Sequence, residues 1–141
     1  MTNLSLIHYY FGEREKAFLV GFGTILRAKG HSKLVSMILI DNSFSWITDF
    51  GIEDVPHTII ESGDTENSII KKILEVLNGL KDTICLIANF DILINNKTIS
   101  LKNLMRTIHD LDTSNEYIFT SEKYFKEFEE FADYVSHVQE L

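Results

Sequence analysis

The chain has 141 residues, 45% of them hydrophobic and 24% charged, a composition that is typical of one folded domain and excludes a disordered segment. Its formal net charge is −8 and its lysines and arginines form no cluster, which argues against nucleic-acid partners and anionic membrane surfaces. No apolar run approaches the roughly 20 residues of a membrane span. No basic segment followed by an apolar core opens the chain, so we expect a cytoplasmic protein without a membrane partner.

The N-terminal half alternates between strand and helix patterns. In order, it predicts a strand at residues 4–10, a helix at 16–29, strands at 33–40 and 57–61, and a helix from about 64 to 80. Asp64 or Thr65 is placed to cap that last helix. Residues 41–56 combine turn formers and scattered aromatics without a period, which is typical of an irregular loop. Within it, Phe44 and Trp46 are candidates for contact with a partner.

The C-terminal half continues the alternation. It predicts a strand at 83–88, a helix from a Ser100 cap to His109, a strand at 116–120, a helix from Ser121 to Ala132 and a last strand at 134–138. Strands without polar alternation are buried on both faces, so we expect an α/β fold with a mostly parallel sheet of about five or six strands between two helical layers. Ligands of such sheets bind at the carboxyl ends of the strands. Those ends follow Tyr10, Ile40, Ala88 and Thr120.

Other reactive or aromatic residues have structural interpretations. Cys85 lies within an apolar strand, which favours a packed thiol, and the histidines lack the spacing of a zinc site, so we expect no metal centre. His31 follows a helix and is placed to cap its C-terminal end. An aromatic stripe with mostly helical spacing is expected in the core rather than on a base-stacking surface. Its members are Tyr124, Phe125, Phe128, Phe131 and Tyr134.

Three stretches share order and spacing with one known family. They are "LIHYYFGEREKAFLVGFGTILRAKGHSKLV", "TICLIANFDILINNKTISLKNLMRTI" and "EYIFTSEKYFKEFEEFADYVSHVQEL". Together they resemble the ATP:corrinoid adenosyltransferases, which transfer the 5′-deoxyadenosyl group of ATP to the cobalt of a reduced corrinoid such as cob(I)alamin or cob(I)yrinic acid a,c-diamide. The positions that match the family's patterns are Gly23, Arg27, Ala28, Gly30, His31, Lys33, Glu130, Ala132, Asp133 and Val135.

The resemblance implies one domain over residues 1–141 with a three-layer P-loop NTPase fold of the RecA-like kind, and three sites at the strand ends. The first is a degenerate Walker A phosphate loop of Gly12, Glu13, Arg14, Glu15, Lys16 and Ala17. The second is a degenerate acidic site of Ala88, Asn89 and Asp91, and the third is the strand end at Thr120 and Ser121. Catalytic residues cannot be assigned from these patterns.

Each site departs from the family's chemistry. Glycines let backbone N–H groups converge on phosphate, and a threonine holds magnesium, but Glu13 and Glu15 replace glycines and Ala17 replaces the threonine. Glutamates close to a phosphate repel it, unless they point outward as favourable first-turn helix residues. In the second site, Ala88 and Asn89 stand in place of Asp-Glu, and we expect Asp91 to be solvated or to cap a helix.

The third site departs as well, because "TSE" stands where the family has Thr-Gly-Arg. We therefore expect Thr120 and Ser121 to cap the last helix rather than to bind phosphate. The favoured hypothesis is a catalytically impaired relative of the family that acts as a binding or interaction module. Two alternatives stay open. The first is an active adenosyltransferase that uses ATP, Mg²⁺ and a corrinoid through Lys16, Arg14 and Asp91 in an altered geometry, and the second is a regulatory partner of a complete paralogue. A homodimer or a heteromer with that paralogue is the implied assembly.

Overall fold

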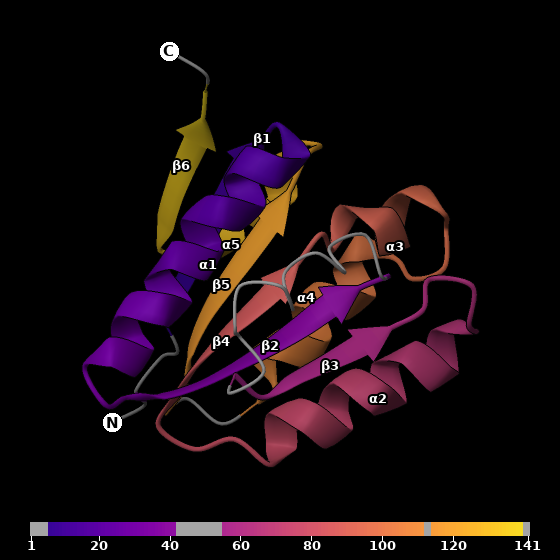
Figure 1. Cartoon of the computed structure of the whole chain (residues 1–141). Helices are drawn as coiled ribbons and strands as arrows, with labels where there is room; N and C mark the ends of the chain where they lie inside the picture. Colours follow the sequence, from indigo (N-terminus) through magenta and orange to yellow (C-terminus); the bar gives the residue numbers. More distant parts are fainter. Residues whose placement is uncertain (1–5, 42–54, 112–113, 140–141) are drawn as a thin grey trace.

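A computed structural model describes residues 6–41, 55–111 and 114–139. Six strands form one sheet in the order β3-β2-β4-β5-β1-β6, and every pairing is parallel (Figure 1). The strands are β1 (Leu6–Gly12), β2 (Leu34–Ile40), β3 (His57–Ile60), β4 (Thr83–Ala88), β5 (Glu116–Ser121) and β6 (Tyr134–Val138). The predicted parallel sheet is confirmed. The two candidates for contact with a partner, Phe44 and Trp46, lie outside the described residues.

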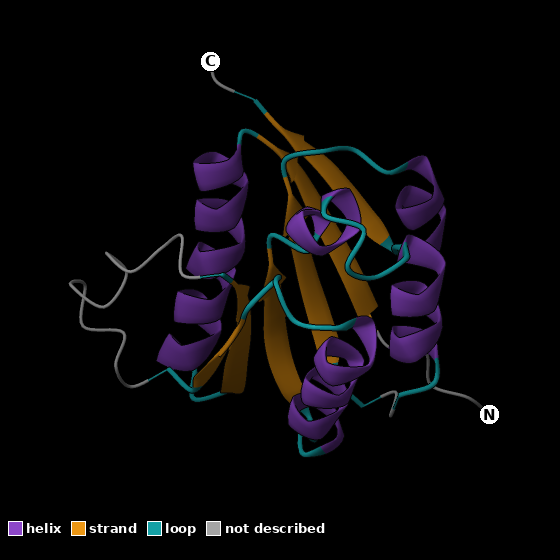
Figure 2. Ribbon diagram, turned by 90° about the vertical axis from the view of Figure 1, so that its right-hand side faces the viewer, coloured by secondary structure: helices purple, strands orange, loops and turns teal. Residues whose placement is uncertain are grey.

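Helices cover both faces of the sheet, as Figure 2 shows. They are α1 (Arg14–Gly30), α2 (Glu66–Asn78), α3 (Asp91–Asn95), α4 (Leu101–His109) and α5 (Lys126–Phe131). Caps predicted from the sequence are confirmed at two of them: Thr65 accepts the N–H of Ser68, and Ser100 accepts the N–H of Asn103. None of the helices in the described part of the chain combines the length and the apolarity that a membrane span requires.

The central strands feed two separate cores. Met37 and Leu39 of β2 face the core under α1, where Phe18 and Phe22 are buried, whereas Ile38 contributes to the core under α2, α4 and α5. Successive side chains of a strand point to opposite faces, so an unbroken apolar strand can serve both layers. The predicted burial on both faces is therefore confirmed.

The C-terminal aromatic stripe divides between core and surface. Phe125 and Phe128 are buried in the core under α5, and Phe131 is partly buried against it. Tyr124 and Tyr134 are exposed instead, so the prediction of a wholly buried stripe is wrong for its two ends. The reason is that α5 is short, so helical spacing does not continue through either tyrosine.

Gly12 fixes the approach of the edge strand β6. It pairs with Val138 and has a φ of 149°, in a region that side chains rarely adopt. A Cβ atom at this position would lie 2.2 Å from the carbonyl oxygen of Val138. Glycine is required at this position by the close contact between β1 and β6, and not by a phosphate.

Candidate functional site at the carboxyl edge of the sheet

The three predicted sites lie together at one edge of the sheet. Strands β4, β5 and β1 are neighbours and run in the same direction, so their carboxyl ends meet. Direct contacts join side chains from all three: Arg14 follows β1, Asp91 follows β4 and Glu122 follows β5. The strand ends that the sequence analysis singled out therefore meet at a common edge.

The segment expected to form a phosphate loop has almost no loop. Strand β1 ends at Gly12 and α1 begins at Arg14, so Glu13 alone connects them, with φ −54° and ψ 131°. The carbonyl oxygen of Glu13 already accepts the N–H of Ala17 at 2.9 Å, which is a helical hydrogen bond. A phosphate-binding loop instead needs a run of several free backbone N–H groups before the helix.

The side chains of this segment point away from a phosphate site or into the core. Glu13 and Glu15 are exposed, so they do not crowd a cradle as their sequence positions suggest, and they lie at the positive end of α1. Nζ of Lys16 lies 3.7 Å from Oε2 of Glu13. Ala17 is fully buried, so the place of the missing threonine belongs to the core.

Arg14 and Asp91 form a bidentate ion pair across the strand ends. Nη1 donates to Oδ1 at 3.0 Å and Nη2 donates to Oδ2 at 2.7 Å. Asp91 is fully buried, so the expectation of a solvated aspartate is wrong: it opens the short helix α3 inside the protein. Paired, bidentate geometry is what allows a carboxylate to remain charged away from water.

Asp91 also holds the segment that follows β5. Its Oδ2 accepts the backbone N–H groups of Glu122 and Lys123 at 3.3 and 3.4 Å. The carboxylate of Glu122 lies 3.4 Å from Nη2 of Arg14 on the solvent side of the pair. The guanidinium and carboxylate that could have bound phosphate and metal are therefore engaged with each other and with the backbone.

A buried tyrosine completes this network. The hydroxyl of Tyr9 lies 3.1 Å from Oγ of Ser121 and 3.2 Å from the carbonyl oxygen of Lys123, and it accepts the N–H of Phe125 at 3.1 Å. Burial raises the pKa of Tyr9, so its hydroxyl remains neutral at ordinary pH. Sequence reasoning missed Tyr9 because it lies inside a strand and follows no motif.

The residues of the third site do not cap a helix. Ser121 ends β5 and donates to the carbonyl oxygen of Lys123 at 2.6 Å, while α5 begins only at Lys126. Thr120 is buried, and its carbonyl oxygen and Oγ1 accept the N–H of Asn89 at 2.9 and 3.1 Å. The prediction of a cap is wrong because both hydroxyls instead join β5 to its neighbours.

Asn89 is the unusual residue of this edge. It is 1% exposed and has a φ of 65°, a left-handed conformation. Among the described residues, the buried side-chain polar atoms without a hydrogen-bond partner are the two amide atoms of Asn89. Such atoms are rare in native proteins and mark a place that a water molecule or ligand can complete.

A second left-handed residue ends the neighbouring strand β2. Asp41 has a φ of 58°, and its carboxylate accepts the N–H and the hydroxyl of Ser62 at 2.7 and 2.8 Å. It is thus also committed to an internal contact. Within the described ranges, no group of three or more histidine, cysteine, aspartate or glutamate side chains could hold a metal ion.

Comparison of this chain with known proteins identifies its fold but no family. No protein-family model and no curated protein matches the chain. Among solved structures, C. elegans PCH-2 is similar, with a TM-score of 0.54 and 17% sequence identity. The similarity covers 94% of this chain, which spans 35% of the PCH-2 chain. The chain has a P-loop NTPase-like α/β fold with a parallel sheet, and the loss of phosphate binding stays a prediction.

Proposed function

We propose that this chain is a non-catalytic relative of the ATP:corrinoid adenosyltransferases that acts as a binding or interaction module in the cytoplasm. The observation that carries the non-catalytic part is the buried ion pair between Arg14 and Asp91. It ties up Arg14 and Asp91, which are a cation and a carboxylate at neighbouring strand ends. The direct passage from β1 into α1 removes the loop in which phosphate oxygens would be bound. The corrinoid connection is supported by the sequence resemblance alone.

The unpartnered amide of Asn89 supports a binding role over a purely structural one. A buried amide without partners costs about 1–3 kcal/mol relative to one that is hydrogen-bonded. Asn89 lies at the carboxyl end of a central strand, where ligands of parallel sheets bind. A small polar molecule that bonds both amide atoms would recover that cost without any phosphate chemistry.

Titration with MgATP, followed by calorimetry, tests the proposal. Up to millimolar concentration, we expect no magnesium-dependent binding that Lys16→Ala abolishes, so the carboxyl edge contributes less than about 4 kcal/mol of binding free energy. Saturable micromolar binding that requires magnesium and disappears in Lys16→Ala would overturn the proposal and favour an active adenosyltransferase.

A restored loop sequence separates the effect of side chains from that of the backbone. The variant Glu13→Gly, Glu15→Gly, Ala17→Thr recreates the residue types of a phosphate loop. We expect it to bind MgATP no more tightly than the native chain, because the helix begins directly after Glu13 and Ala17 is buried. Recovery of nucleotide binding would show that the side chains alone prevent it, and that the short connection between β1 and α1 does not.

A second candidate function is supported by the outer surface of α1. Leu19, Val20 and Leu26 are 47%, 39% and 44% exposed on this helix. Clustered exposed apolar side chains are typical of contact surfaces. They favour a regulatory subunit that pairs with a complete adenosyltransferase paralogue. Mixing the two purified proteins should give a complex on size-exclusion chromatography that Leu19→Glu with Leu26→Glu abolishes, and two separate peaks for the unmodified proteins would reject this candidate.

A further inference from the structure

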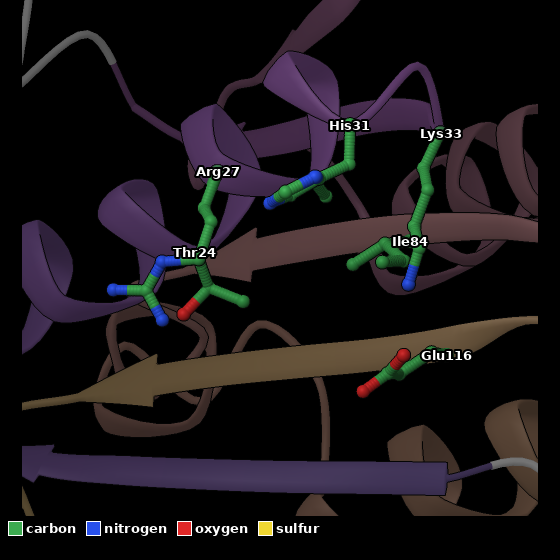
Figure 3. A pocket seen from close by; sticks show the side chains of 7 residues that line it. Thr24, Arg27, His31, Lys33, Ile84 and Glu116 are labelled. Atoms are coloured by element: carbon green, nitrogen blue, oxygen red, sulfur yellow. The ribbon is translucent and has the colours of Figure 1, made fainter.

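A second candidate site lies at the opposite, amino edge of the sheet. A hollow of about 430 Å³ opens there between the C-terminal half of α1 and the starts of β2, β4 and β5. Its lining consists of Thr24, Arg27, Ala28, His31, Lys33, Ile84 and Glu116 (Figure 3). Four of these, Arg27, Ala28, His31 and Lys33, belong to the RAxGHxK pattern of the sequence. The function proposed for the carboxyl edge of the sheet assigns no role to the residues of this pattern.

The basic side chains of the hollow have no internal partners. Arg27, His31 and Lys33 are exposed, and no hydrogen bond or ion pair joins their side chains to the part of the chain that the structure describes. They come from two elements: Arg27 and His31 from the end of α1, and Lys33 from the approach to β2 (Figure 3). Two cations and an imidazole therefore face one hollow in a protein whose net charge is −8.

One carboxylate lines the hollow, that of Glu116, and it is engaged with a histidine of the neighbouring strand. Oε1 of Glu116 lies 2.5 Å from Nε2 of His8 on the adjacent strand β1. The carbonyl oxygens that end α1 accept backbone N–H groups: those of Arg27 and Ala28 accept the N–H of His31, and that of Ala28 also accepts the N–H of Lys33. The basic side chains are thus left to attract an anion from solution.

The other residues that line the hollow indicate which chemical groups the bound anion contains. Ala28 is buried and Ile84 is partly buried, and they form an apolar floor. Oγ1 of Thr24 donates its hydrogen to the carbonyl oxygen of Val20 at 3.2 Å, so it can accept a hydrogen bond from a ligand hydroxyl. A phosphate, an apolar ring face and a hydroxyl group are complementary to these three features, and the volume lies in the range of small-molecule sites.

We propose that the hollow binds a phosphate monoester of a ring-containing hydroxylated compound, of the class of nucleoside monophosphates. The charged ends of Arg27 and Lys33 lie apart in Figure 3, and these exposed side chains turn toward the phosphate beside His31 when it binds. Thr24 accepts a hydroxyl group, and the ring packs over Ala28 and Ile84. The site binds without reaction. It lies at the far edge of the sheet from the Arg14–Asp91 pair and is independent of the function proposed for that edge.

The test uses AMP as the probe and amide chemical shifts of the ¹⁵N-labelled chain as the readout. We expect saturable shifts at residues 27–33, 84 and 116. Adenosine lacks the phosphate, so the titration of the same residues should give an affinity at least tenfold lower than that of AMP. This factor corresponds to about 1.4 kcal/mol of binding free energy. Equal responses to inorganic phosphate and to AMP would overturn the role of the apolar floor. An absence of saturable shifts with AMP would overturn the site itself.

Matched variants separate this site from the carboxyl edge. Arg27→Gln with Lys33→Gln removes exposed, unpaired charges, so the fold should persist and AMP affinity should fall at least tenfold. Lys16→Gln removes one positive charge at the other edge of the sheet and should change the AMP affinity less than about twofold. Shifts confined to residues 12–17 and 89–91 would overturn this proposal and also contradict the non-catalytic proposal. A loss of AMP affinity in Lys16→Gln, with unchanged affinity in the Arg27→Gln, Lys33→Gln variant, would also contradict both proposals.

Discussion

The two edges of the sheet use basic side chains in opposite ways. At the carboxyl edge, Arg14 is held by a fully buried carboxylate and adjoins a second, exposed one. At the amino edge, Arg27 and Lys33 are exposed and make no ion pair with the described residues. A P-loop NTPase-like fold normally binds its ligand at the first edge. In this chain Arg14 at that edge is paired internally, whereas Arg27 and Lys33 at the other edge are unpaired within the described residues.

The difference between the edges indicates which cations stabilise the fold and which are available to bind a ligand. A guanidinium that is paired with a buried carboxylate stabilises the fold and is unavailable to a ligand, because releasing it would leave Asp91 charged and unpaired. An exposed, unpaired guanidinium contributes little to stability and is available. The contrast between the edges therefore predicts large losses of folding free energy for changes at the carboxyl edge and small ones at the amino edge.

The largest loss is expected for Asp91→Ala. Removing one partner of a buried ion pair costs about 3–5 kcal/mol, because the other charge is left without compensation. Arg14 keeps some access to water, with 24% of its side chain exposed, so we expect about 3 kcal/mol, the lower end of that range. Urea unfolding at neutral pH measures the loss.

Glu122→Ala is the matched control for this experiment. The carboxylate of Glu122 contacts the same guanidinium at 3.4 Å, but 56% of its side chain is exposed. We expect a change below about 0.5 kcal/mol, as for other surface pairs. Similar losses in the Asp91 and Glu122 variants would show that burial does not distinguish the two contacts, and the comparison of the edges would lose its basis.

Alanine substitution of two glycines, one in β1 and one in α1, gives the next largest difference in folding stability. Gly12→Ala places a Cβ atom 2.2 Å from the Val138 carbonyl oxygen, so β6 must move away, at a cost of about 3 kcal/mol. Gly23→Ala meets no atom within 4 Å and should stabilise α1 by about 0.5–1 kcal/mol. Thermal unfolding of both variants measures the difference. A tolerated alanine at position 12 would contradict the tight β1–β6 contact.

The Tyr9 network predicts a pH-dependent contribution to stability. Burial raises the pKa of Tyr9 above the ordinary tyrosine value of 10.0. Above about pH 10, the unfolded chain therefore loses this proton while the folded chain keeps it, and stability falls as the pH rises toward the folded pKa. Below pH 10, we expect Tyr9→Phe to cost about 2 kcal/mol, because Ser121 and the Phe125 N–H lose a partner.

Urea unfolding at about pH 8 and pH 11 tests the Tyr9 contribution, and the stability gap between the native protein and Tyr9→Phe should narrow at the higher pH. Burial also raises the pKa of Cys85, to about 12, and this thiol is common to both proteins, so it cancels in the gap. A gap that does not change with pH would mean that the Tyr9 hydroxyl is not protected in the folded state.

The fold could be predicted because it follows from local patterns. The apolar strands, the Thr65 and Ser100 caps and the alternation of β and α segments each arise from a few neighbouring residues, and parallel pairing follows from burial on both faces. The segment after Ser121 was not predictable, since its backbone is fixed by Tyr9 and Asp91 from distant parts of the chain. Long-range hydrogen bonds override a cap signal that is read locally.

The candidate site could be placed but not understood from the sequence. The strand ends at positions 12, 88 and 121 do meet, as the topology requires. The sequence does not reveal that Arg14 and Asp91, 77 positions apart, pair with each other. It also gives no sign of the backbone conformation of Asn89, because asparagine at a strand end is read as a turn residue.

A smaller effect is expected at Asn89, where conformation and polarity can be separated. Asn89→Ala places a non-glycine side chain at a φ of 65° and should cost about 1 kcal/mol. Asn89→Gly fits this conformation and removes the unpartnered amide, so its stability should equal or exceed that of the native chain. Equal losses in both variants, measured by urea unfolding, would mean that the amide has partners in solution and that no ligand is needed to complete it.

The smallest effect comes from repeating one substitution at both edges. Arg27→Gln and Lys33→Gln remove exposed cations near the end of α1, where favourable interaction with the helix dipole is worth a few tenths of a kcal/mol, so each should cost less than about 0.5 kcal/mol. Arg14→Gln removes the partner of a buried carboxylate and should cost about 3 kcal/mol. The same chemical change, followed by urea unfolding, thus distinguishes a cation that belongs to the fold from one that is free for a ligand. If Arg27→Gln were as damaging as Arg14→Gln, the amino-edge cations would be structural, and the hollow they line would have no charge left to offer a phosphate.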